Sequence, residues 1–396
     1  MHNGSKDQPK QVGMRNVTIL GLVSLFTDFS TEMISGILPL FIVTDLGASR
    51  AILGAIEGSA EFTGYSFRLV SGSLSDKIGR RKIFILAGYG LSAISKPFFS
   101  ISYNWFDVLI VRLSDRIGKG IRTAPRDALI SDSVREASAG KAFGIHRTLD
   151  QSGAILGPVA AFALLQFVEV RDIFLLSLIP GAVAIIILVF MVKDVVTKTV
   201  GSNVFTANIL HLLKENRSFV ILLFLTGIFG LGAYNFSFVL LRSSDLGVTQ
   251  SSIPLVYATI NITHTAIGVP SGILADRIGR EKVLLLGYSI FILSSLLMIL
   301  FSENLLYAFV LGAVYGLYLG ISETVQRAMI PKYVNSNVRG TAYGLYNLII
   351  GSTFFIGNVV FGYLWDIYGL GVAISYSSIF VISAILGMIV FIKRHR

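Results

Sequence analysis

The sequence predicts an all-α polytopic membrane protein made of two related six-helix halves. Three observations support this fold class. Of the 396 residues, 53% are hydrophobic and 14% are charged, and the mean hydropathy is +0.72. A soluble domain carries about 25% charged residues, so most of this chain must face lipid or a buried bundle. The other two observations are a series of twelve apolar segments and an internal repeat.

Each apolar segment is long enough to cross a bilayer as a helix, which takes about 20 mostly apolar residues. The expected spans cover residues 17–43, 50–75, 83–102, 106–131, 141–168, 173–192, 217–241, 251–275, 283–302, 305–330, 341–365 and 370–392. One longer polar stretch separates the first six spans from the last six. We therefore expect an N-terminal six-helix bundle over 1–192, a cytoplasmic linker over 193–216 and a C-terminal bundle over 217–396.

The internal repeat has a constant offset of 200 residues. The stretch 72–82 recurs as 272–282, and the same offset pairs Asp45 with Asp245 and Gly157 with Gly357. A register that holds without a gap from 45 to 157 indicates a duplicated membrane unit. Transporters that open alternately to the two sides of a bilayer are built in this way.

The net charge of +10 reflects the membrane topology of the chain and does not indicate nucleic-acid binding. Lysines and arginines concentrate in alternate connections, whereas the intervening connections hold only Arg50, Arg171 and Arg242. Basic connections stay on the cytoplasmic side, so we expect a multi-pass protein of the cell membrane with both termini in the cytoplasm.

The two repeated connections resemble the loop signature of the major facilitator superfamily, Gly-x-Leu-x-Asp-Arg/Lys-x-Gly-Arg-Arg/Lys. The first copy fits at every key position, and the second departs at Glu281. The resemblance covers the whole chain and implies this family's fold, with twelve transmembrane helices in two pseudo-twofold-related halves. The charged run over 112–132 resembles a little-characterised prokaryotic branch of this family, and that branch resembles proton-coupled antiporters. The motif residues are Gly72, Asp76, Gly79, Arg80, Gly272, Asp276, Gly279 and Arg280.

The resemblance also implies a cytoplasmic gate at these loops. A carboxylate is attracted to the free amides and partial positive charge at a helix N-terminus. We expect Asp76 to meet the start of the eleventh helix near Thr341, and Asp276 to meet the start of the fifth near Lys141. The alternative is that the loops only fix the topology.

A second motif, Gly153-Ala-Ile-Leu-Gly157-Pro158, resembles the Gly-x-x-x-Gly-Pro-x-x-Gly-Gly motif that antiporters of this superfamily carry in helix 5. The final two glycines are missing, since Ala161 and Phe162 stand there. The motif favours export by exchange. Small residues four apart also allow two helices to cross closely, which is the competing interpretation.

Ionisable residues gather in the first half of the chain. Two acid pairs are spaced four apart on the first two helices, and a basic stripe runs along one face of the fourth. From the helical rise, acids and stripe share mid-membrane depth. The corresponding positions of the second half are mostly uncharged. The candidate residues are Asp28, Glu32, Glu57, Glu61, Arg112, Asp115, Arg116, Lys119, Arg122 and Arg126.

A charge at that depth costs at least about 2.5–3.5 kcal/mol, so these groups should face the bundle interior and pair. One interpretation is proton coupling with recognition of a charged part of a substrate. The other is a static ion-pair network that holds helices 1, 2 and 4 together. Lesser candidates are His146, Arg147, Asp150, Asn235, Asn261, His264, Tyr315, Tyr318, Glu323 and Arg327.

Together these features predict a secondary active transporter of a small solute, working by proton-coupled efflux. The alternatives are proton-coupled uptake of a small metabolite, with an anion as one candidate, and a receptor that binds without transporting. Five scattered histidines, no cysteine and no phosphate-binding loop argue against an enzyme or an ATP-driven pump. We expect a monomer with a small-molecule substrate, protons and the lipid bilayer as partners, and no nucleic acid, metal or cofactor.

Overall fold

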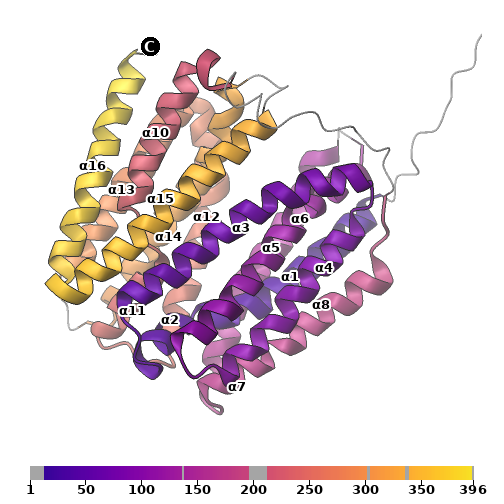
Figure 1. The fold of residues 1–396 in the computed structure, drawn as a ribbon, viewed down its shortest axis with the longest axis horizontal. Helices are drawn as coiled ribbons and strands as arrows, with labels where there is room; N and C mark the ends of the chain where they lie inside the picture. Colours follow the sequence, from indigo (N-terminus) through magenta and orange to yellow (C-terminus); the bar gives the residue numbers. More distant parts are fainter. Residues whose placement is uncertain (1–12, 136–137, 196–211, 301–303, 335–338, 395–396) are drawn as a thin grey trace, which may run out of the picture.

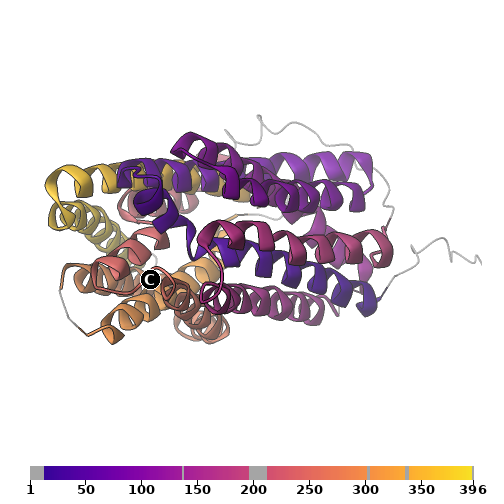
Figure 2. The same cartoon turned by 90° about the horizontal axis from the view of Figure 1, so that it is seen from below.

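The chain folds into a bundle of long α-helices, in which the earlier helices gather on one side and the later ones on the other (Figure 1, Figure 2). The computed structural model describes residues 13–135, 138–195, 212–300, 304–334 and 339–394. Within these ranges, twelve helical segments of spanning length follow one another. The all-α fold expected from the sequence is therefore confirmed. The linker expected at 193–216 lies largely outside the described residues, so the division into two bundles stays a prediction.

Three of the first six segments are interrupted helices. In chain order, the six segments are α1 with α2 and η1 (Met14–Ser35, Leu38–Leu40, Phe41–Asp45), α3 (Arg50–Ile78), α4 with η2 (Lys82–Ser95, Lys96–Ile101), α5 (Trp105–Ser133), α6 (Ala139–Leu164), and α7 with α8 (Val170–Leu176, Leu178–Met191). Pro39 and Pro97 stand at two of the interruptions, because proline fits the start of a new helical turn but cannot continue the old hydrogen bonds.

The second six segments repeat the pattern with one interruption. They are α10 with α11 (Arg217–Gly232, Phe236–Asp245), α12 (Ile253–Ile278), α13 (Arg280–Ile299), α14 (Leu306–Tyr333), α15 (Arg339–Tyr368) and α16 (Leu370–Arg394). Gly79 and Gly279 both adopt positive φ, +70° and +100°, where the chain turns out of α3 and α12. Glycine reaches this region without steric cost, which accounts for its place in both copies of the motif.

Length and hydropathy alone identify eight of the described segments as able to cross a membrane. The four others are α3, α5, α6 and α12, whose charged or polar residues lower their hydropathy. All four contribute side chains to one central cavity. The low hydropathy of these four helices therefore reflects the polar residues that they place in the interior of the bundle. It does not mean that these helices lie outside the membrane.

Both described ends of the chain lie on one side of the bundle, which we call the terminal face. The amide of Gly13 donates to the carbonyl of Ser133 at the end of α5, and Phe391 near the end of α16 packs its ring against Tyr333 at the end of α14. The opposite side, where α3 begins at Arg50, is the far face.

An ion pair at the terminal face is repeated in the two halves with its charges reversed. Arg81 pairs with Asp132 at 2.9 Å, and the residues 200 positions later, Glu281 and Lys332, pair at 2.5 Å. Glu281 departs from the family signature because its partner has changed sign. In the first copy, burial opposes the charge of Arg81, but hydrogen bonds to Asp76 and Asp132 outweigh it and raise the pKa of the guanidinium.

This reversal makes a testable prediction for the second copy. Glu281→Arg alone sets two cations together, and Lys332→Asp alone sets two acids together, so each should destabilise the protein. The double variant restores the arrangement of the first copy and should recover most of the loss. A double-mutant cycle on unfolding in detergent should give a coupling of about 0.5–3 kcal/mol, as for residues in direct contact. Additive single effects would show that the two side chains do not interact.

Candidate functional site

A cavity of about 350 Å³ lies at the centre of the bundle, between the earlier and the later helices. Its walls come from α1, α3, α5 and α6 on one side and from α10, α11, α12, α14 and α15 on the other. On α5, which runs from the far face to the terminal face, the lining residues occupy 116–127, in the second half of the helix. On α6, which runs the opposite way, they occupy 147–154 in the first half. The cavity therefore extends from mid-membrane toward the terminal face.

Seven of the ten candidate residues line this cavity, and three do not. The seven are Asp28, Glu32, Glu61, Arg116, Lys119, Arg122 and Arg126. The remaining three form a buried network behind the cavity wall. Arg112 and Glu57, each 1% exposed, pair at 2.8 Å, and Asp115 accepts a 2.5 Å hydrogen bond from the Ser92 hydroxyl. The basic stripe of α5 thus divides into a structural part and a part that faces the cavity.

Several ionisable groups of the cavity wall already have polar partners. Arg116 pairs with Glu61 at 3.3 Å, and Glu32 accepts a 2.5 Å hydrogen bond from the hydroxyl of Tyr257 on α12. The second contact joins the two halves of the chain. Arg126 pairs with its neighbour Asp127 at 2.9 Å.

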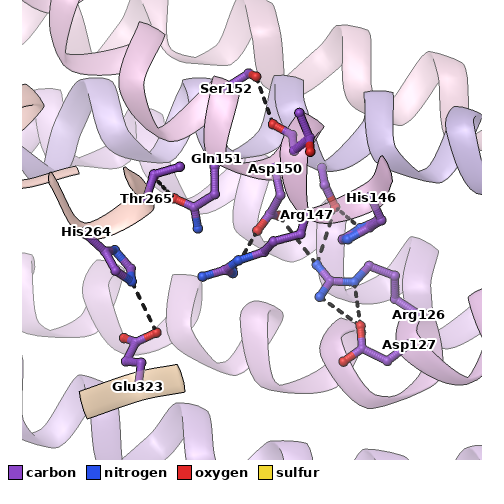
Figure 3. Close-up of polar contacts among 12 residues, drawn as sticks. Arg126, Asp127, His146, Arg147, Asp150, Gln151, Ser152, His264, Thr265 and Glu323 are labelled. Carbon is purple, nitrogen blue, oxygen red and sulfur yellow. Dashed lines mark hydrogen bonds and ion pairs between the residues drawn. The ribbon is translucent and has the colours of Figure 1, made fainter. Parts of the chain in front are cut away.

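Asp150 on α6 is the centre of a polar cluster that the sequence ranked only as a lesser candidate (Figure 3). Its carboxylate pairs with Arg147 at 3.2 Å and lies 3.9 Å from Arg126. Its side chain is also within hydrogen-bonding contact of the Asp28 carboxyl on α1. Two ionised carboxylates placed this close repel each other, and a proton bound to either one relieves that repulsion.

Two cations of the cavity wall lack such partners. Arg122 is 3% exposed, and its Nε and Nη1 atoms are buried without a hydrogen bond. Its guanidinium carbon lies 4.6 Å from the ring centre of Tyr89. One helical turn earlier, Lys119 lines the cavity, and among the described residues its ammonium group donates no hydrogen bond and has no carboxylate within 4 Å. The charges that act on Lys119 from further away are those of Arg116, Glu61, Asp28 and Glu32.

The wall from the later helices is largely aromatic. Its rings come from α10, α11, α12, α14 and α15, and they are Phe229, Phe236, Tyr257, Tyr315, Tyr318 and Phe354. Tyr315 donates its hydroxyl to the carbonyl of Tyr234 at 2.8 Å, so its polar end is occupied. Ionisable groups on this wall are His264 and Glu323, which lie 3.6 Å apart (Figure 3). The cavity therefore has one charged wall and one aromatic wall.

The gate residues adopt a different arrangement from the expected latch. Asp76 pairs with Arg81 at 2.6 Å, and Asp276 lies 3.7 Å from Arg280, so each carboxylate is engaged beside its own loop. Both carboxylates are also largely exposed, 55% and 74%. The expected contacts of Asp76 with the start of α15 and of Asp276 with the start of α6 stay a prediction.

The glycine motif of α6 serves a close helix crossing. A Cβ atom on Gly153 would lie 2.2 Å from the carbonyl oxygen of Leu25, and one on Gly157 would lie 2.7 Å from that of Phe29. Both carbonyls belong to α1, so glycine at these two positions lets α6 lie against α1. This packing brings Asp150 to Asp28. The assignment of Gly153, Gly157 and Pro158 to an antiporter motif stays a prediction.

The two halves are closed against each other at the far face. A Cβ atom on Gly54 of α3 would lie 2.2 Å from the carbonyl oxygen of Asn358 on α15. Asp366 caps the start of α3 by accepting hydrogen bonds from the amides of Arg50, at 3.2 Å, and Ala51, at 2.9 Å. The Arg50 side chain lies 3.6 Å from the same carboxylate. The structure is thus closed at the far face, and its cavity lies toward the terminal face.

Asp366→Asn should weaken this closure and favour the opposite conformation. The chain has no cysteine, so Ala51→Cys supplies a single thiol at the closed far face and Ser322→Cys one in the cavity. Loss of a charged hydrogen bond should speed maleimide labelling at position 51 about tenfold, the effect of about 1.4 kcal/mol. Labelling at position 322 from the terminal side should slow in parallel. Faster labelling at both positions would mean local loosening and not a shift between two conformations.

Comparisons with known proteins agree with this architecture. A sequence model of the Major Facilitator Superfamily matches residues 20–242 and 220–393. An uncharacterized MFS-type transporter of Methanocaldococcus jannaschii is 33% identical over 89% of each chain, and the multidrug resistance protein MdtG of Proteus mirabilis is 28% identical over 78% of this chain and 80% of its own. The nucleoside transporter NupG has the same fold, with a TM-score of 0.80 and 15% identity over 97% of this chain and 100% of its own.

Proposed function

The chain belongs to the major facilitator superfamily of secondary transporters, and from that premise we propose that it couples the passage of a small solute to protons. The observation that carries the proposal is the contact of the Asp28 and Asp150 carboxyl groups in the cavity wall. A shared proton at this place is reachable from the cavity, and its loss would leave two charges in contact. The pair therefore has different charge in two states of the transport cycle.

The proton pair connects directly to the helices that must move. Asp28 belongs to α1 and Asp150 to α6, while Asn261 of α12 donates a 2.8 Å hydrogen bond to the carbonyl of Ala154 on α6. Glu32, one turn after Asp28, is bonded to Tyr257 of α12. Losing the proton would change the charge beside these contacts between the halves, which supports a link between protonation and rocking of two bodies, residues 1–192 and 217–396.

We take the terminal face to be cytoplasmic, because the basic connections and the described chain ends lie there. The cavity of this structure then opens inward. In the alternate, outward-open state, Asp76 and Asp276 would leave their local arginines and cap the starts of α15 and α6. This assignment keeps the loop motif as a gate, but one that engages only after the halves close at the terminal face.

Export in exchange for protons is the first mode supported by the sequence. The motif at Gly153–Pro158 resembles that of antiporters, and multidrug resistance proteins are among the more distant relatives. In this mode, solute binding from the cytoplasmic side would expel the proton from the Asp28–Asp150 pair. Each conformational change then carries one of the two particles: the solute in one direction and the proton in the other.

Cotransport of an anion with protons is the second mode, and the free cations favour it. Lys119 and Arg122 offer positive charge to a solute, and protonation of a nearby acid would strengthen the same field. An anion and a proton would then enter together. Uptake down an inward proton gradient follows from this mode.

The test uses purified protein in proteoliposomes that enclose the pH dye pyranine. Compounds that raise the unfolding temperature of the protein are added outside, since a ligand of the native state stabilises it. Under the proposal, such a compound moves protons only when protein is present: inward with the compound for cotransport, and outward against it for exchange. A stabilising compound that crosses the membrane through the protein with no pyranine signal would refute proton coupling.

A further inference from the structure

We infer that the central cavity takes an organic anion with a flat apolar body, whose anionic group binds between Lys119 and Arg122 and whose ring system lies against the aromatic wall. This inference rests on the proposed transport function and names the class of solute. It follows from three properties of the cavity: which charges are free, which are already neutralised, and what covers the opposite wall.

The free charges of the cavity are cations. Arg122 is 97% buried, yet its Nε and Nη1 atoms have no hydrogen-bond partner. Both atoms are covered by protein, so a bound anion would gain from the unneutralised charge of Arg122 and not from bonds to these two atoms. A carboxylate, sulfonate or phosphate would supply the missing negative charge, and Lys119 on the preceding turn of α5 adds an ammonium group that donates to the same anion.

The acids of the cavity, by contrast, are already engaged. Among the described residues, Glu61 pairs with Arg116, Glu32 accepts from Tyr257, and Asp150 pairs with Arg147. Asp28 is in contact with Asp150. A cationic solute would have to break one of these contacts, whereas an anion would pair with Lys119 and Arg122, which have no carboxylate partner among the described residues. The charge distribution therefore selects an anion over a cation.

The opposite wall selects a flat apolar body. Phe229, Tyr318 and Phe354 present rings to the cavity, and Phe229 is held in place by stacking on Tyr288 with ring centres 3.7 Å apart. Rings fixed by their neighbours favour offset stacking or edge contact with another ring. A cavity of about 350 Å³ holds one small molecule and not a peptide chain or a polymer.

The test measures equilibrium binding of naphthalene-2-sulfonate to the full chain in detergent, followed by the probe's own fluorescence. Arg122→Gln and Lys119→Gln should each weaken binding about 10- to 100-fold, the effect of losing a charged hydrogen bond. The matched control is Arg135→Gln, which removes an exposed arginine just past the end of α5 and should leave binding unchanged. Arg122→Lys keeps the charge and should retain part of the affinity.

Selectivity of the unmodified protein gives a second measurement that does not depend on the folding of any variant. Naphthalene-2-sulfonate should bind at least about tenfold more tightly than its neutral sulfonamide or than methanesulfonate, which lacks the ring. Tighter binding of 2-naphthylmethylammonium would overturn the inference, as would equal binding by the parent and the Lys119→Gln, Arg122→Gln double variant.

The inference and the proposed function can fail separately. If protons move in the pyranine assay with a cationic or neutral compound but not with organic anions, the solute class is wrong and proton coupling stands. If organic anions bind at Arg122 and cross the membrane through the protein without proton movement, the solute class stands and the coupling is wrong.

Discussion

Replacing Arg112 with methionine is expected to lower the free energy of unfolding by about 3–5 kcal/mol, the range for breaking a buried ion pair from one side. Arg112 and Glu57 are both 1% exposed, and their side chains meet at 2.8 Å between α5 and α3. Without the guanidinium, the Glu57 carboxylate would stay in the bundle interior with no partner. Unfolding of the full chain in mixed micelles with increasing SDS, followed by circular dichroism, measures the loss.

The companion variant removes both charges. Arg112→Met combined with Glu57→Leu should be close to the parent in stability or above it, because apolar side chains of similar volume avoid the cost of dehydrating two ions. Asp115 would still accept its hydrogen bond from Ser92. If Arg112→Met unfolds like the parent, the pair is hydrated and does not support the bundle. If the double variant is as unstable as the single one, the cost comes from packing and not from the stranded charge.

These variants separate the two interpretations of the ionisable residues. The static network describes Glu57, Arg112 and Asp115, which lie behind the cavity wall, packed between α3, α4 and α5. It does not describe Lys119 or Arg122, which line the cavity and, in the part of the chain that the structure describes, pair with no carboxylate. The sequence could not divide the stripe in this way. Spacing of three or four residues places side chains on one helix face, but that face is wide enough to reach both a neighbouring helix and a cavity.

The depth of each charge in the membrane could be predicted, because position along a helix follows from its rise per residue. The partner of each charge could not. Glu32 bonds to Tyr257, which is 225 residues later, and Asp28 meets Asp150 only because Gly153 and Gly157 let α6 lie against α1. Such contacts depend on how whole helices pack. Asp150 was accordingly ranked below the acids of the first two helices.

The loop motif shows a similar division between what the sequence determines and what the conformation decides. The sharp turns at Gly79 and Gly279 were predictable, since both positions need positive φ. The carboxylate contacts were not, because a gate residue has one partner in each conformation and a single sequence encodes both. The reversed pair at Glu281 and Lys332 was visible in the sequence only as a departure from the signature. Its partner became evident from the contact in the folded chain.

Replacing Asp28 with asparagine is expected to uncouple solute movement from protons. Asparagine has nearly the same shape and can still hydrogen-bond to Asp150, but it carries no exchangeable charge. Solute accumulation driven by a pH gradient should fall about 5- to 150-fold, the range that coupling free energies of about 1–3 kcal/mol produce. Exchange of labelled for unlabelled solute at equal pH should continue, because it needs only the conformational change. Both are measured in proteoliposomes.

The matched comparison uses the acids that the sequence ranked first. Glu32→Gln keeps an acceptor for the hydroxyl of Tyr257, so coupling should persist, although the contact between α1 and α12 weakens. Glu61→Gln strands the buried Arg116 and should reduce solute binding more than coupling. Because Asp150 also holds Arg147, Asp150→Asn should lose coupling and stability together. Full coupling in Asp28→Asn, with loss in Glu32→Gln or Glu61→Gln, would place the proton on those acids and leave the Asp28–Asp150 contact a structural one.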